Sequence, residues 1–137
     1  MKKSYILELE DIETIVNEIL SHITNGVVLL KGDLASGKTT LVKAIAKKLG
    51  CEDEVTSPTF SLQQCYGENI FHYDIYNHGF EHFVSLGMGE ELEKDGLHFI
   101  EWADDELKEF LELVGIDFIE IEILKLDNKR KYEICTH

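Results

Sequence analysis

Arginine, proline and cysteine are scarce in this sequence of 137 residues, which contains one arginine, one proline and three cysteines. The cysteines, Cys51, Cys65 and Cys135, are odd in number and widely spaced, and no C-x-x-C pair occurs. Neither a disulfide framework nor a zinc knuckle is therefore indicated. Apolar runs are only a few residues long, and the amino-terminal MKKSYILELEDIE turns acidic before the apolar region of a signal peptide could develop. We expect a cytoplasmic protein with no membrane association.

Positive charge is also scarce. The sequence has 27 acidic and 13 basic residues, which gives a net charge of −14. Because affinity for nucleic acid rests largely on lysine and arginine neutralising phosphates, this surface should on average repel RNA and DNA. Any link to nucleic acid is expected to run through a partner protein.

The pattern of apolar residues predicts alternating strands and helices in a single domain, residues 1–137. The predicted strands are residues 4–9, 27–31, 61–66, 69–76, 97–102, 117–126 and 131–137, and the predicted helices are 11–24, 38–50, 80–94 (interrupted at Gly87 and Gly89) and 104–113. Hairpins are predicted around residues 67–69 and across the DNKR turn. This order indicates an α/β fold with a mixed, mostly parallel central sheet, flanked by helices and extended by β-hairpins.

The segment GDLASGKT, residues 32–39, matches the phosphate-binding pattern G-x-x-x-x-G-K-[ST] in full. It follows a predicted strand and opens a predicted helix, which is the setting of a P-loop nucleoside triphosphatase. Backbone N–H groups of such a loop form a cradle for anions at the positive end of the helix. Lys38 would reach the β- and γ-phosphates of ATP, and Thr39 would bind Mg²⁺. The predicted nucleotide-binding residues are Asp33, Leu34, Ala35, Ser36, Gly37, Lys38, Thr39 and Thr40.

A P-loop also needs a carboxylate for Mg²⁺, normally at the end of a neighbouring apolar strand. Asp74 ends the segment IFHYD, and Glu101 ends the segment LHFIE. We predict Glu101 as the metal ligand because it ends the more clearly buried run, with Asp74 acting through a metal-bound or attacking water. The alternative for either residue is a solvated acid at the end of a strand.

The segment VTSPTFS, residues 55–61, places the only proline, Pro58, among four hydroxyl side chains. One interpretation is a turn that leads into a strand. The other is a switch-like loop in which Thr56, Ser57 or Thr59 senses the γ-phosphate and Mg²⁺. The spacing of these residues leaves both interpretations open.

Three further residues could serve a site. His78 and His82 have a spacing that can hold a metal, but no third ligand is evident, and a polar helix face explains them better. Trp102, the only tryptophan, is by default a packing residue. Its place directly after Glu101 makes it a candidate for supporting the site.

The motifs and residue types that the sequence lacks distinguish between the possible classes of nucleotide-binding enzyme. Neither the N-K-x-D nor the D-x-x-G motif of guanine-specific GTPases is present, so guanine selectivity is unsupported. A small-molecule kinase generally uses several arginines to hold its phosphates, and Arg130 alone, close to the carboxyl terminus, does not meet that need. An arginine finger supplied by the chain itself is disfavoured for the same reason. Of the activities considered, the one that remains is weak basal ATP hydrolysis, which is stimulated when a partner completes the site.

Four segments, GDLASGKTT (32–40), SPTF (57–60), HYDIY (72–76) and IEW (100–102), closely resemble the TsaE family, also called YjeE, in their order and spacing. Members of that family are small bacterial P-loop ATPases needed to make threonylcarbamoyladenosine in tRNA. The resemblance spans about residues 11–136. Many families share the P-loop, but SPTF, H-x-D-x-Y and E-W together are quite specific.

The resemblance implies a P-loop ATPase domain that binds ATP and Mg²⁺, with Lys38, Asp74 and Glu101 as its catalytic residues and Thr39 and Glu101 as its metal ligands. It favours the switch-like interpretation of SPTF. It also makes Tyr76, like Trp102, a candidate for supporting the site or a partner contact.

The resemblance further implies TsaB and TsaD as partner proteins. ATP hydrolysis would reset the TsaB–TsaD complex between turnovers, and tRNA would be handled by these partners, in agreement with the acidic surface. Two departures from the family pattern are Ala35–Ser36, where Gly-Ala is common, and Asn77, where an arginine usually follows D-x-Y. The alternative functions are a stand-alone kinase for a small metabolite and a nucleotide-gated binding module with negligible turnover.

Overall fold

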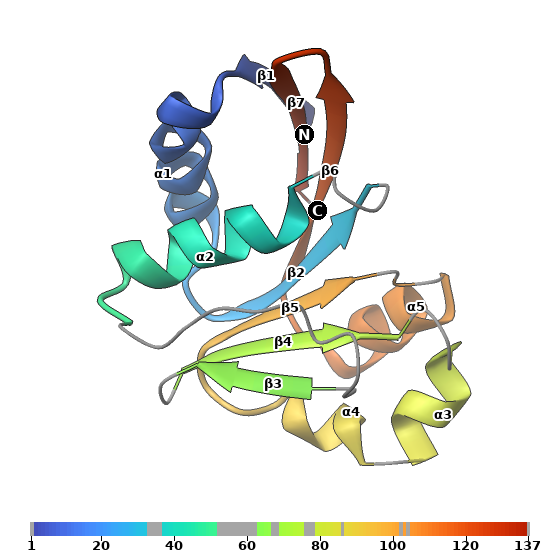
Figure 1. The fold of residues 1–137 in the computed structure, drawn as a ribbon. Helices are drawn as coiled ribbons and strands as arrows, with labels where there is room; N and C mark the ends of the chain where they lie inside the picture. Colours follow the sequence, from blue (N-terminus) through green and yellow to red (C-terminus); the bar gives the residue numbers. More distant parts are fainter. Residues whose placement is uncertain are drawn as a thin grey trace.

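The computed structural model describes most of the chain, and Figure 1 shows how its elements are arranged. The described residues are 2–32, 37–51, 63–66, 69–75, 79–85, 87–101, 103 and 105–136. In chain order the elements are β1 (Lys2–Leu7), the 3₁₀ helix η1 (Leu9–Asp11), α1 (Ile12–His22), β2 (Gly26–Lys31), α2 (Lys38–Lys48), β3 (Gln63–Tyr66), β4 (Ile70–Asp74), α3 (Gly79–Ser85), α4 (Met88–Glu91), β5 (Leu97–Glu101), α5 (Asp105–Val114), β6 (Phe118–Leu126) and β7 (Lys129–Thr136). No helix within these ranges is long and apolar enough to cross a membrane.

The described strands form one seven-stranded sheet in the order β1-β7-β6-β2-β5-β4-β3. The four central strands, β6, β2, β5 and β4, run parallel to one another. Antiparallel strands extend both sides: β7 and then β1 beyond β6, and β3 beyond β4. The predicted α/β fold, with a parallel centre in a mixed sheet and hairpin additions, is confirmed.

Both faces of the central strand β2 are covered, which explains its uninterrupted apolar sequence. Because side chains alternate along a strand, Val28 and Leu30 pack in a core with α1 and α2, whereas Val27 and Leu29 pack in a second core with α3 and α5. Figure 1 shows α1 and α2 together on one side of the sheet. We call this side the α1/α2 face.

The helices and strands lie close to their predicted positions. The predicted helix 80–94 is divided into α3 and α4, and the predicted interruption at Gly87 is confirmed, whereas the one predicted at Gly89 is wrong, because Gly89 lies within α4, which ends at Glu91. Gly87, which precedes α4, has a φ of +79°, a conformation that favours glycine over residues with a side chain. The hairpins β3–β4 and β6–β7 form where they were predicted.

His98 is a fully buried polar residue of β5, and its contacts indicate which ring nitrogen carries the proton. Nε2 lies 2.8 Å from the backbone carbonyl of Lys94, so this nitrogen donates. Nδ1 accepts from the Tyr73 hydroxyl at 2.7 Å, and the Gln63 amide donates to the same hydroxyl oxygen at 3.2 Å. The ring also stacks on Phe71, with centroids 4.5 Å apart. Neutral His98 therefore has a partner for each ring nitrogen.

We expect His98 to make the folded protein sensitive to mild acid. Burial lowers the pKa of His98, and the smaller effects of the Lys94 carbonyl and the Glu91 charge oppose this. Between the lowered value and the unfolded value of about 6.5, the unfolded chain binds more protons. The free energy of unfolding therefore falls with falling pH in this window, by at most about 1.4 kcal/mol per pH unit for one proton.

Urea denaturation at about pH 7.5 and about pH 5.5 measures this effect. His98→Gln removes the titrating group, so the variant should lose less stability than the wild type between the two conditions. An equal loss of stability in both proteins would contradict the prediction.

Candidate nucleotide-binding site

The parallel strands β2, β4 and β5 end together at one edge of the sheet, and the predicted acidic residues lie there. Leu30 of β2 is the register partner of Glu101, the last residue of β5. Glu101 is in turn the register partner of Asp74, the last residue of β4. Ligands of open α/β sheets bind at the carboxyl ends of the strands. This edge is therefore the expected place for a site.

Lys38 begins helix α2 at the same edge, directly after Gly37. Gly37 precedes the helix with a φ of +110°, in the left-handed region, and provides no side-chain cap for the first turn. Lys38 is only 5% exposed, and its Nζ donates a hydrogen bond to the carbonyl oxygen of Gly32. A buried ammonium at the positive end of a helix needs negative groups nearby.

Glu101 supplies one such group, and its carboxylate is held from two sides. Nζ of Lys38 lies 3.7 Å from Oε1. Nε2 of His72, on β4, lies 2.6 Å from Oε2, and it donates because a carboxylate only accepts. Glu101 is 4% exposed and His72 is fully buried. The two contacts orient the carboxylate toward the start of α2 before any ligand binds.

Strand alternation explains why these side chains meet. Ile70 of β4 and Phe99 of β5 belong to the core under α1 and α2. His72, Asp74 and Glu101 lie an even number of residues further along the same strands, so they share the α1/α2 face. The amino terminus of α2 lies over this face, where Lys38, Glu101 and His72 form one contacting cluster. Asp74 lies on the same face as the register partner of Glu101.

The described residues fit a bound nucleoside triphosphate with Mg²⁺. The first turn of α2 offers backbone N–H groups with no side-chain cap and no acidic residue, and Lys38 adds a cation. Glu101, Asp74 and the half-buried Thr39 carry the oxygen atoms that Mg²⁺ prefers as ligands. Thr40, the last residue predicted for this site, is exposed on α2.

Several predicted residues lie outside the described residues. They are Asp33, Leu34, Ala35 and Ser36 of the phosphate-binding pattern, Thr56, Ser57, Pro58 and Thr59 of the switch-like segment, and Tyr76, Asn77, His78 and Trp102. The side chain of His82 is also outside the described part. Their predicted roles stay predictions.

Two residues beside the site were missed by the sequence analysis. His72 could have been found, because it precedes Asp74 by two residues and a strand places both on one face. Arg130 is the other: its Nε lies 3.6 Å from the position that a Cβ atom would occupy on Gly37. Its place near the carboxyl terminus of the chain disfavoured Arg130 in the sequence analysis and gives no sign of this proximity.

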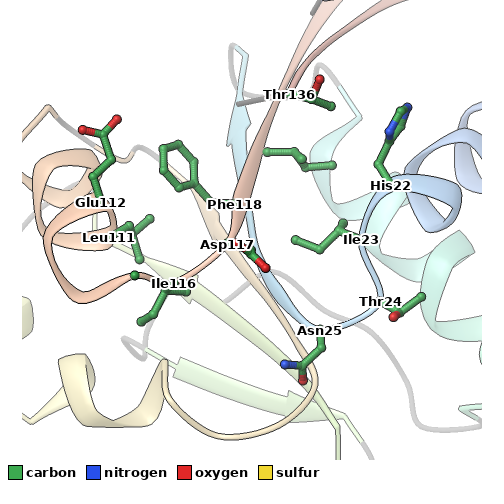
Figure 2. Close-up of a pocket in the computed structure, with 12 residues that line it drawn as sticks. His22, Ile23, Thr24, Asn25, Leu111, Glu112, Ile116, Asp117, Phe118 and Thr136 are labelled. Atoms are coloured by element: carbon green, nitrogen blue, oxygen red, sulfur yellow. The ribbon is translucent and has the colours of Figure 1, made fainter.

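A cavity of about 660 Å³ lies at the opposite edge of the sheet, as Figure 2 shows. His22, Asn25, Leu111 and Asp117 are among the residues that line it. Asn25 precedes β2 and Asp117 precedes β6, so the cavity is at the amino ends of the parallel strands. It is separate from the carboxyl edge, where Lys38 and Glu101 lie.

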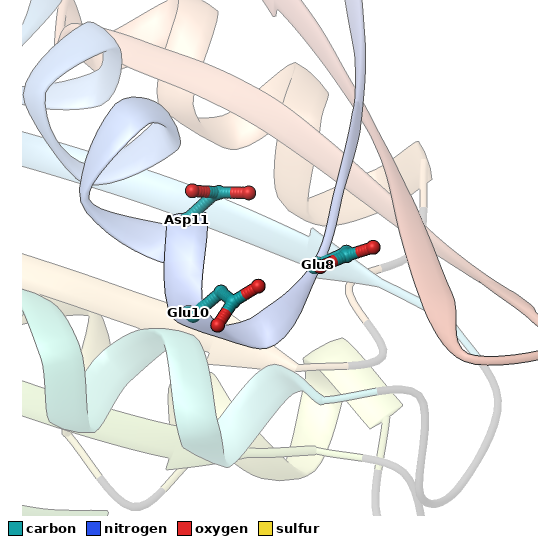
Figure 3. A group of neighbouring side chains, drawn as sticks. All are labelled: Glu8, Glu10 and Asp11. Carbon is teal, nitrogen blue, oxygen red and sulfur yellow. The ribbon is translucent and has the colours of Figure 1, made fainter.

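A group of three acidic residues, Glu8, Glu10 and Asp11, lies before α1, as Figure 3 shows. Their carboxylate oxygens are within 4.8 Å of one another. A hydrogen bond with Glu8, followed by the charge of Asp11, raises the pKa of Glu10. The group is largely exposed and is not part of the predicted Mg²⁺ site.

The fold and the site together define the class of this protein. It is an α/β protein in which a lysine at the start of a helix faces a buried carboxylate, at the edge where the parallel strands have their carboxyl ends. A family model described as "Threonylcarbamoyl adenosine biosynthesis protein TsaE" matches residues 6–132. The chain therefore belongs to the TsaE family, as its motifs indicated.

Individual relatives agree with this assignment. The chain is 36% identical over 109 residues to a protein of Treponema pallidum, covering 75% of this chain and 79% of the relative. It is 37% identical over 117 residues to a protein of Rickettsia prowazekii, covering 82% of this chain and 76% of the relative. Both relatives are named tRNA threonylcarbamoyladenosine biosynthesis protein TsaE.

A solved structure has the same fold. The crystal structure of Bacillus subtilis YdiB superposes with a TM-score of 0.68 at 22% sequence identity. The match covers 99% of this chain and 86% of YdiB. The α/β arrangement described above is thus shared with an experimentally determined protein.

Proposed function

We propose that this chain is an ATPase that binds ATP with Mg²⁺, hydrolyses it weakly alone, and supports the threonylcarbamoyladenosine modification of tRNA by acting on a TsaB–TsaD complex. The observation that carries the ATPase proposal is the buried cluster of Lys38, Glu101 and His72 at the start of α2. Membership of the TsaE family supports the pathway.

Each side chain of the cluster has a role in this proposal. Lys38 binds phosphate oxygens of ATP, while His72 holds the Glu101 carboxylate in place. Thr39 and Glu101 would hold Mg²⁺, which neutralises phosphate charge when bound. Asp74, the register partner of Glu101, orients the attacking water.

The charge of the chain supports an indirect link to tRNA. A net charge of −14 opposes direct binding of a polyanion, so the partner proteins would hold the tRNA adenosine next to the anticodon. A cytoplasmic location fits such a role.

Measuring phosphate release from ATP with and without the TsaB–TsaD complex tests the proposal. We expect slow release by the chain alone and a rate at least about tenfold higher with the complex, because a partner completes the site. Binding of ATP without release under either condition would favour a nucleotide-gated binding module instead. Transfer of ³²P from ATP to a small metabolite without partners would favour a kinase.

A further inference from the structure

The only arginine of the sequence lies beside the amino terminus of α2. Nε of Arg130 is 3.6 Å from the position of a Cβ on Gly37, the residue directly before Lys38. Nη1 of Arg130 donates a hydrogen bond to the backbone carbonyl of Lys129 at 3.1 Å. The guanidinium group is therefore next to the candidate phosphate-binding residues, although it comes from the other end of the chain.

The register of the sheet explains this position. β2 ends at Lys31, which pairs with Glu122 of β6, but β6 continues to Leu126 and is followed by β7. Arg130 of β7 pairs with Lys125, three residues beyond Glu122 and thus about 10 Å further along the strand. The β6–β7 hairpin, which Figure 1 shows at the top of the molecule, therefore projects beyond the end of β2.

The alternation of side chains along β7 places Arg130 on the same face of the sheet as the candidate site. Tyr132 and Ile134 belong to the core under α1 and α2. Since alternate residues share a face, Arg130 lies on the α1/α2 face, where the candidate site is, while Lys129 and Lys131 lie on the opposite face. Lys129 and Lys131 therefore carry the same charge as Arg130 but lie on the face of the sheet away from the candidate site.

We propose that Arg130 is a phosphate-binding residue of the same nucleotide site, supplied by the chain itself from the β6–β7 hairpin. This inference rests on the proposed function. Three positive groups lie together here: the amino terminus of α2, the Lys38 ammonium and the Arg130 guanidinium. This arrangement favours a bound anion. A guanidinium group also matches phosphate geometry, because it can donate two parallel hydrogen bonds to its oxygens.

The proposal is tested by measuring nucleotide affinity in three proteins: wild type, Arg130→Gln and Arg130→Lys. In each protein, a bound fluorescent ATP analogue is displaced by unlabelled ATP and, separately, by ADP. We expect ATP affinity to fall about tenfold in Arg130→Gln, as for the loss of one charged hydrogen-bonding group, and less in Arg130→Lys. The dependence of ATP affinity on KCl concentration should also become weaker in Arg130→Gln.

Lys129→Gln is the matched control, because it removes the same charge from the next residue of the hairpin. It should bind ATP like the wild type. Equal affinity in Arg130→Gln and wild type, or equal losses in Arg130→Gln and Lys129→Gln, would overturn the inference. A lower melting temperature of Arg130→Gln with unchanged ATP affinity would show a structural role only and would also overturn it. A wild-type protein that binds no ATP would overturn the proposed function itself.

Discussion

Replacing Lys38 with alanine is expected to reduce the affinity for ATP by at least about 100-fold, since the lysine is proposed to make charged hydrogen bonds to the phosphates that alanine cannot make. Lys38 is 5% exposed at the first position of α2, and its ammonium lies 3.7 Å from the Glu101 carboxylate. The substitution removes the cation and leaves a buried carboxylate at the place where phosphates are proposed to bind. Both effects oppose binding of a polyanion.

Calorimetry of ATP binding to Lys38→Ala measures this loss. Lys43→Ala is the matched control, because Lys43 is an exposed lysine of the same helix, and its removal should leave ATP affinity unchanged. Melting curves of both variants establish that they are folded at the temperature used. Wild-type affinity in Lys38→Ala would exclude Lys38 from the nucleotide site.

Replacing Glu101 with glutamine is expected to abolish most hydrolysis while ATP still binds. The glutamine has nearly the same shape, but it removes the negative charge proposed to hold Mg²⁺. Loss of one preorganised charged group at a reacting centre lowers the rate by about 10²–10³-fold. Without Mg²⁺, ATP affinity should not fall and should rise slightly, because no metal contact is lost and the repulsion between the Glu101 carboxylate and the phosphates is removed.

Two measurements distinguish this role from a structural one: phosphate release in the presence of the partner complex, and ATP affinity as a function of Mg²⁺ concentration. Glu120→Gln is the matched control, because Glu120 is a buried strand glutamate on the opposite face, 3.1 Å from Lys31 and 2.6 Å from Lys108. It should keep the Mg²⁺ dependence of the wild type. The same Mg²⁺ dependence in Glu101→Gln and wild type would contradict the assignment of Glu101 as a metal ligand.

Local sequence pattern predicted most of the fold. The apolar run before Gly32 is a strand buried on both faces, and the helical spacing after Lys38 is α2. The two hairpins followed from short turn segments between alternating strands. These features depend on neighbouring residues, so a single sequence contains enough information to predict them.

The candidate site could be predicted only in part. Lys38 and Thr39 belong to a local motif, and Asp74 and Glu101 were found because each ends an apolar strand. The hydrogen bond from His72 to Glu101 depends on the pairing of β4 with β5, which a sequence pattern does not specify.

The sequence by itself determined the order of strands and helices, the phosphate-binding motif, the acidic surface and the resemblance to the TsaE family. The tertiary structure alone decided which residues from distant segments surround the start of α2. Arg130 is the clearest case: the overhang of the β6–β7 hairpin brings it next to Gly37, whereas its sequence position argued against such a role. The physical reason is that strand register and overhang depend on pairing between distant segments, while motifs depend on adjacent residues.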